Sequence, residues 1–180
     1  FGYYKSKIVL ALNACDPEGL PDQLFYSSVS KQPILGYLGT IGHWFDWQLV
    51  ISIAVANPIM IIRLIGPIHH APPNMLPRNI ELLPECDHAT GIRLMQEFTV
   101  GLIPFMQTEL TASVDPIKYY EYRALGLPVI STNFGEMALR CKETGTFISD
   151  GLEDINSLVS KALEFRPDTD QASKFAECNS

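Results

Sequence analysis

Basic residues are scarce in this 180-residue chain, which has 13 Lys and Arg against 20 Asp and Glu and a formal net charge of -7. Proteins that bind nucleic acid need clustered Lys and Arg side chains to neutralise the phosphate backbone. The acidic balance therefore argues against nucleic acid as a partner, although it leaves room for a single local phosphate site.

Closely spaced cysteines are also missing. The four cysteines lie far apart, at Cys15, Cys86, Cys141 and Cys178, and none forms a Cys-x-x-Cys pair. Zinc sites and redox dithiols usually show such close spacing. We therefore expect free thiols in a reducing, cytoplasmic compartment.

No apolar run reaches the ~20 residues of a transmembrane helix. The longest, Ile51 to Ile65, is interrupted by Asn57-Pro58 and by Arg63. The sequence shows no signal peptide. Because it begins at Phe1 and not at Met, we expect it to be a piece of a longer protein.

What the sequence does contain is an alternation of apolar strands and amphipathic helices. Several strands are continuous apolar runs, which is typical of parallel strands buried on both faces. The expected strands are Lys7–Leu12, Ile34–Leu38, Met60–Ile65, Ile80–Leu83, Val100–Pro104, Pro128–Ser131 and Thr146–Ile148. The expected helices are Asp46–Ala56, His88–Phe98, a helix opened by Asp115-Pro116 that stops at Gly126, Leu152–Glu164 and Thr169–Cys178.

This order predicts an α/β fold, a Rossmann-like doubly wound parallel sheet of about six strands with helices on both faces. Ligands of such sheets bind beyond the carboxyl ends of the strands. The loops of interest are therefore 39–45, 66–79, 84–88, 105–116 and 132–137.

The segment from Ser113 to Gly126 carries the strongest chemical signal. Asp115 is a good N-cap and Pro116 a good first-turn residue, so a helix begins here with free N–H groups and a positive dipole end. Lys118 and Glu121 then share one helix face. Lys118 suits a diphosphate, and a carboxylate such as Glu121 can accept two ribose hydroxyls. The alternative is a surface ion pair of a few tenths of a kcal/mol.

The block Asp115-Pro-Ile-Lys-Tyr-Tyr-Glu-Tyr-Arg-Ala-Leu-Gly-Leu-Pro-Val-Ile-Ser-Thr132 resembles the donor-site segment of GT-B fold glycosyltransferases (family 4-like), especially bacterial enzymes of polysaccharide biosynthesis. Other segments agree in order with the same family. They are Asn13-Ala-Cys-Asp16, Ile34-Leu-Gly-Tyr-Leu-Gly39, Leu64-Ile-Gly-Pro67 and Phe98-Thr-Val-Gly-Leu-Ile-Pro-Phe105.

The resemblance implies that residues 31–167 form the C-terminal, donor-binding half of a GT-B enzyme. Residues 1–30 would be the interdomain connection and residues 168–180 a C-terminal helix or tail. Glu121 would bind the donor ribose and Lys118 the diphosphate, the Gly39-Thr-Ile-Gly42 loop would lie near the phosphates, and Leu83, Pro84 and Glu85 would face the base. The implied binding residues are Gly39, Thr40, Pro84, Ser113, Val114, Asp115, Lys118 and Glu121.

Two positions depart from the family pattern. Ser113 stands where many retaining members carry the first Glu of a pair, and Tyr37 stands where an Arg is common. These departures indicate a divergent branch, and they leave the stereochemical outcome of transfer open.

The implied function is transfer from a UDP- or GDP-sugar to a polysaccharide or lipid-linked glycan acceptor, with Lys118 and Glu121 as the catalytic residues. We expect no metal cofactor, because Lys118 and the helix dipole supply the positive field. The acceptor would bind the missing N-terminal domain, so the isolated chain would be inactive. Peripheral association with the inner membrane face is compatible with a lipid-linked acceptor. Two alternatives are a non-catalytic sugar-nucleotide-binding subunit and a sugar-nucleotide epimerase.

Other polar and aromatic residues have weaker signals. His43, Trp44 and Trp47 follow the glycine loop and are predicted to pack at a helix start or to contact the donor. His69-His70 could suggest a metal, but no third ligand is suitably spaced. A nucleophilic role for Cys86 with His88 needs geometry that sequence does not supply. Glu136 is a weak candidate, and Tyr119, Tyr120 and Tyr122 are expected to be packing residues.

Overall fold

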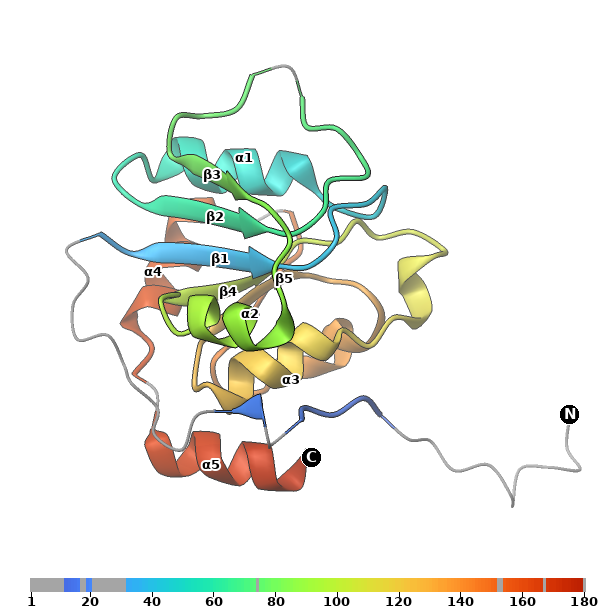
Figure 1. Cartoon of the computed structure of the whole chain (residues 1–180), viewed down its shortest axis with the longest axis vertical. Coiled ribbons are helices and arrows are strands. Elements are labelled where there is room, and N and C mark those ends of the chain that lie inside the picture. The colour runs from blue at the N-terminus through green and yellow to red at the C-terminus, as the bar shows by residue number, and fades with distance from the viewer. Residues whose placement is uncertain are drawn as a thin grey trace, which may run out of the picture.

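The computed structural model describes residues 12–16, 19–20, 32–73, 75–151, 154–166 and 168–179. Within them, one sheet has six strands in the order β3-β2-β1-β4-β5-β6, and every neighbouring pair is parallel (Figure 1). The strands are β1 (Ile34–Leu38), β2 (Ile61–Ile65), β3 (Ile80–Leu83), β4 (Val100–Ile103), β5 (Val129–Thr132) and β6 (Thr146–Ser149). The predicted fold class is confirmed.

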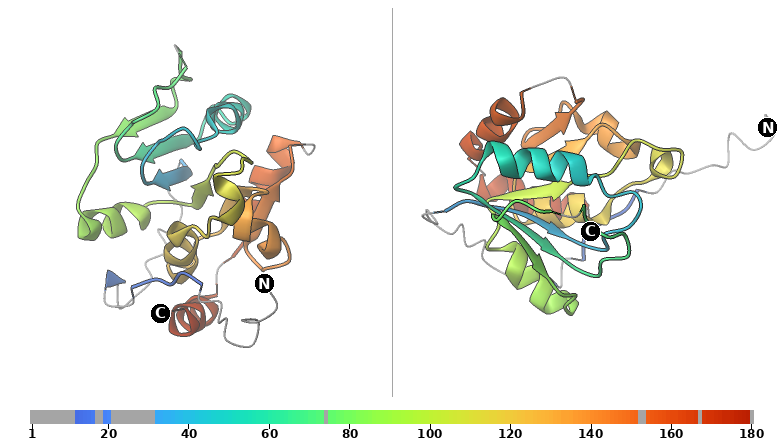
Figure 2. Two further views of the ribbon diagram at one scale, coloured as in Figure 1. Left: turned by 90° about the vertical axis from the view of Figure 1, so that its right-hand side faces the viewer. Right: turned by 90° about the horizontal axis from the view of Figure 1, so that it is seen from above.

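Helices cover both faces of the sheet (Figures 1 and 2). One face carries α1 (Trp47–Ala56) and α4 (Ile155–Glu164), and the other carries α2 (His88–Met95), α3 (Ile117–Ala124) and α5 (Thr169–Cys178). Two short 3-10 helices, η3 (Thr111–Ser113) and η4 (Gly135–Arg140), follow β4 and β5. The sheet thus separates two apolar cores, one under each helix layer.

The strand order places a topological switch point between β1 and β4. From β1 the chain moves outward through β2 and β3, and it then returns to β4 and moves the other way. Connections on opposite sides leave a crevice at the carboxyl ends of the two central strands, which is where ligands of this fold class bind.

Local signals explain the best-predicted helix. The Asp46 carboxylate accepts a hydrogen bond from Leu49 N at 2.9 Å and caps α1, so the helix begins one residue after the expected start at Asp46. The helix ends at Ala56, directly before Asn57-Pro58, because proline lacks an N–H group and disfavours the helical conformation before it.

Three helices differ from prediction. The helix expected at Leu152–Glu164 begins at Ile155, because the Asp154 carboxylate caps it by accepting a hydrogen bond from Asn156 N at 3.2 Å. The second helix stops at Met95, three residues before the expected Phe98, because the chain turns inward and buries the Phe98 ring against Tyr122. The helix before β5 begins at Ile117, with Pro116 at the cap position and no side-chain cap bond. The expected strand Lys7–Leu12 lies outside the described residues except for Leu12.

The last helix packs on the same domain as the sheet. The centroid of the Phe175 ring of α5 lies 5.9 Å from that of Tyr119 and 6.3 Å from that of Tyr120, both of α3.

The domain boundaries drawn from the sequence stay predictions. Within the described ranges, no helix combines the length and apolar character needed to cross a membrane.

Candidate functional site

The carboxyl ends of the strands all meet at the edge toward which β1 and β2 point in Figure 1, and this edge faces the viewer in the left view of Figure 2. The loops after β1 and β4 join there through a bridge between Phe45 and Phe105. The start of α3 follows the second of these loops. The segments selected from the sequence therefore lie at the edge where this fold binds ligands.

The glycine loop after β1 is held against the loop after β2. Gly39 N donates to Ile65 O and Ile41 N donates to Pro67 O, each at 2.9 Å. Gly66 has φ of 135°, and a Cβ atom there would lie 2.2 Å from Gly39 O, so only glycine fits. The Tyr37 hydroxyl donates to Thr40 O at 2.8 Å. Gly39 and Thr40 thus have a fixed backbone, while their contact with phosphates stays a prediction.

Lys118 and Glu121 form the pair that their spacing predicted. Lys118 Nζ donates to Glu121 Oε2 at 2.5 Å, and the Glu121 side chain is only 7% exposed against 26% for Lys118. The alternative of an ordinary surface ion pair does not describe this contact, because the Glu121 carboxylate is buried. A buried carboxylate needs bonding partners to offset its lost hydration.

A second partner of Glu121 comes from α2. His88 Nε2 lies 3.3 Å from Glu121 Oε1, although 33 positions separate the two residues. The sequence suggested His88 only as a weak candidate beside Cys86. The structure instead brings it to the carboxylate, so Lys118 and His88 hold one oxygen of Glu121 each.

Asp115 does not act as the predicted helix cap. Its carboxylate accepts from Arg140 Nη1 at 2.9 Å and from the Tyr120 hydroxyl at 2.8 Å. Arg140 is a stronger partner than a backbone N–H, because a guanidinium bond to a carboxylate is charge-assisted. Asp115 therefore fixes the turn before α3 from the side, and the first N–H groups of α3 have no side-chain cap.

Arg140 is a residue that the sequence did not single out. Its guanidinium is 7% exposed and lies over the rings of Tyr119 and Tyr120, 4.3 Å and 5.0 Å from their centroids. Burial, and then the bond to Asp115, raises the pKa of the Tyr120 hydroxyl. Both tyrosines pack as expected, but they also support the turn of the candidate site.

The segment around Asn13 contacts the same turn. Asn13 N donates to Asp115 Oδ2 at 2.9 Å, and Asn13 Nδ2 donates to Asp115 O at 2.5 Å. Cys15 is buried, and its N–H donates to Asn179 O at 2.8 Å. The motif Asn13-Ala-Cys-Asp16 therefore lies between the start of α3 and the end of α5.

The remaining predicted binding residues are more dispersed. Ser113 is exposed at the end of η3, and Val114 O accepts from Glu136 N at 3.2 Å. Pro84 is exposed directly after β3, in the loop that leads to His88. These positions border the same edge, and no contact here tests their binding roles.

The aromatic residues after the glycine loop lie in different environments. Trp47 is buried in the core, which confirms its predicted packing role. Trp44 packs edge-on against Phe105, and the His43 ring lies 4.6 Å from the His70 ring. In the part of the chain that the structure describes, no three His, Cys, Asp or Glu side chains converge as a metal site.

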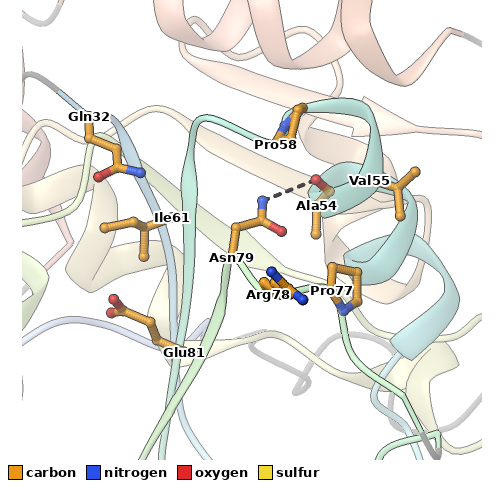
Figure 3. Close-up of a pocket in the computed structure, with 9 residues that line it drawn as sticks. All are labelled: Gln32, Ala54, Val55, Pro58, Ile61, Pro77, Arg78, Asn79 and Glu81. Carbon is orange, nitrogen blue, oxygen red and sulfur yellow. Dashed lines mark hydrogen bonds between the residues drawn. The ribbon is translucent and has the colours of Figure 1, made fainter.

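Two recesses lie away from the Lys118–Glu121 pair. One, of about 510 Å³, opens at the amino ends of β2 and β3, opposite the candidate site (Figure 3). The Asn79 amide closes one wall by donating to Ala54 O at 3.0 Å. The other, of about 380 Å³, lies at the carboxyl edge between the starts of α1 and α4. Neither recess is lined by Lys118 or Glu121.

No protein-family model and no curated protein matches the sequence. Solved structures match the fold. AviGT4, a glycosyltransferase involved in avilamycin A biosynthesis, superposes with a TM-score of 0.66 at 16% identity over 84% of this chain and 47% of its own. The catalytic domain of starch synthase IV from Arabidopsis thaliana, bound to ADP and acarbose, gives 0.56 at 14% identity over 88% of this chain and 35% of its own.

HepE from Anabaena, solved in complex with UDP, gives a TM-score of 0.54 at 14% identity over 83% of this chain and 44% of its own. The chain thus spans less than half the length of each of these structures. Identities this low show fold and not substrate. The chain has the fold of part of a GT-B glycosyltransferase, as the sequence resemblance indicated.

Proposed function

We propose that this chain is the donor-binding part of a glycosyltransferase and binds a UDP- or GDP-sugar at the start of α3. The observation that carries this proposal is the Lys118–Glu121 pair, which lies on one face of the helix that begins at the ligand-binding edge of a GT-B fold. Structures with this fold have been solved with UDP and with ADP, which supports a nucleotide donor.

The two residues would have complementary roles. Lys118 stands in the first turn of α3, where the helix dipole is positive and the first N–H groups lack a side-chain cap. It would stabilise the diphosphate as the bond to the sugar breaks, which is an electrostatic role that needs no proton transfer. Glu121, one turn deeper, would accept hydrogen bonds from the ribose hydroxyls.

The site would be completed outside this chain. Lys118 and Glu121 lie outside the two recesses described above. Ligand sites usually enclose most of a small molecule, so we infer a second wall that would face the start of α3. The chain spans less than half the length of each of the solved structures with this fold. We assign the second wall and the acceptor, a polysaccharide or a lipid-linked glycan, to a further domain. The 180-residue chain would bind donor weakly and transfer no sugar.

Calorimetric titration with UDP-glucose and GDP-mannose tests the proposal. Lys118→Met and Glu121→Gln should each weaken binding roughly tenfold to a hundredfold, since a hydrogen bond to a charged group contributes about 1.5–3 kcal/mol. The chain offers a matched control in Lys161 and Glu164, which have the same spacing on α4 but are exposed on the other face of the sheet.

Lys161→Met and Glu164→Gln should leave both affinities unchanged. Unaltered binding in the α3 variants would reject the site. If neither UDP-glucose nor GDP-mannose binds the unmodified chain, the proposed function is rejected.

A further inference from the structure

The Glu121 carboxylate is covered by the two groups that bind it. Lys118 Nζ binds Oε2 and His88 Nε2 approaches Oε1, and only 7% of the Glu121 side chain is exposed. Because the side chain is this deeply buried, a ligand hydroxyl gains access to the carboxylate when one of these groups moves away. Lys118 is 26% exposed, whereas His88 is 54% exposed and sits on a different helix. Displacing His88 therefore moves the more exposed of the two groups and leaves the Lys118–Glu121 pair of α3 in place.

We propose that His88 gates the donor site: in the free chain it covers the Glu121 carboxylate, and it leaves that carboxylate when the ribose of a nucleotide sugar binds. This inference rests on the proposed function. It adds a residue that the nucleotide must displace.

His88 has charged neighbours on more than one segment. Glu121 and Lys118 face it from α3. Asp16 lies nearby, because a Cβ atom on Gly19 would lie 3.0 Å from His88 Cε1 and 3.9 Å from Asp16 Oδ2. Asp87 and Cys86 precede His88 in the chain, and the Asp87 carboxylate is engaged with Thr90.

Binding of the ribose at the Glu121 carboxylate therefore has to break its contact with His88. A hydrogen bond to a charged group is stronger than one between neutral groups, so the loss of this contact lowers the affinity for the donor. Removing the His88 side chain should raise that affinity.

UDP-glucose titrations of the 180-residue chain test the gate. His88→Ala should bind UDP-glucose roughly threefold to tenfold more tightly than the unmodified chain, because the donor no longer has to break the contact with Glu121. His88→Gln, whose amide can still donate to Glu121, should stay closer to the unmodified chain.

Arg93→Gln is the matched control, because it removes a charge from an exposed residue of the same helix, one that bonds Thr90. It should bind UDP-glucose as tightly as the unmodified chain. A second readout is the nuclear Overhauser contact between the His88 ring and the Glu121 side chain, which UDP-glucose should abolish. Thermal unfolding of each variant checks that it is folded.

Equal UDP-glucose affinities of the unmodified chain and His88→Ala would overturn the gate, as would a contact between His88 and Glu121 that persists when the ligand is bound. If Glu121→Gln still weakens binding in that case, the proposed function stands and only the gate fails. If UDP-glucose does not bind the unmodified chain, the proposed function fails and the gate fails with it.

Discussion

Arg140 and Asp115 form an ion pair with an N–O distance of 2.9 Å across 25 positions of the chain, and both side chains are largely buried. The pair ties η4 to the turn that opens α3. Because Asn13 bonds the same aspartate, three separate segments meet at one carboxylate. The position of Lys118 and Glu121 thus depends on residues that bind no ligand themselves.

Arg140→Met should destabilise the chain by about 3–5 kcal/mol, since removing one member of a buried ion pair leaves an uncompensated charge. Arg140→Lys should recover only part of this loss, because an ammonium lacks the planar fork that reaches both Asp115 and the Tyr120 hydroxyl. Urea unfolding measures both. Arg166→Met, which removes bonds to exposed carbonyls only, should stay within about 0.5 kcal/mol of the unmodified chain. Equal effects at the two positions would contradict the structural role of Arg140.

Gly66→Ala and Gly151→Ala separate steric clash from backbone strain. Both glycines have positive φ, 135° and 80°, but a Cβ atom at Gly66 would meet Gly39 O at 2.2 Å, whereas nothing lies within 4 Å at Gly151. We expect a loss of about 1–2 kcal/mol at Gly151 from conformational strain. At Gly66, overpacking should add about 1–3 kcal/mol. Chemical denaturation of the two variants shows which one loses more stability. A smaller loss of stability for Gly66→Ala than for Gly151→Ala would show that the loops after β1 and β2 can separate freely.

Alkaline pH should destabilise the fold through its buried tyrosines. Burial, followed by the bond to Glu143, raises the pKa of Tyr119 to about 12. The unfolded residue ionises near about pH 10. The contribution of Tyr119 is therefore fully present below pH 10 and is lost as the pH rises toward 12, because the unfolded state releases its proton first.

The size of this effect can be measured with Tyr119→Phe. Between pH 8 and pH 11 its unfolding free energy should fall by about 1 kcal/mol less than that of the unmodified chain. Identical losses in the two proteins would show that Tyr119 ionises as readily in the folded state as in the unfolded one.

Alkylation should distinguish Cys15 from the other three cysteines. All four are free thiols, but Cys86, Cys141 and Cys178 are exposed, while Cys15 is buried and burial raises its pKa. Because the thiolate is the reactive form, iodoacetamide at pH 8 should modify the three exposed residues first. Peptide mass spectrometry after timed quenching reports each site. Rapid modification of Cys15 would show that the segment around Asn13 does not stay packed against α5.

Most of the secondary structure could be predicted because its signals are local. Continuous apolar runs such as Ile34–Leu38 identified the strands, and Asp46 with Pro58 marked the ends of α1. The errors lie where contacts with residues distant in the sequence determine the local conformation. Phe98 packs in the core and lies outside α2, and Asp115 binds Arg140 and does not cap α3.

The sequence by itself determined that Lys118 and Glu121 meet, because residues three apart share a face of any helix. It also determined the order of strands and helices, and with it the edge at which a ligand would bind. Only the tertiary structure decided that Glu121 is buried, that His88 covers it and that Arg140 holds Asp115. These contacts join residues 33 and 25 positions apart, and no local periodicity encodes a pairing that depends on how whole helices pack across a sheet.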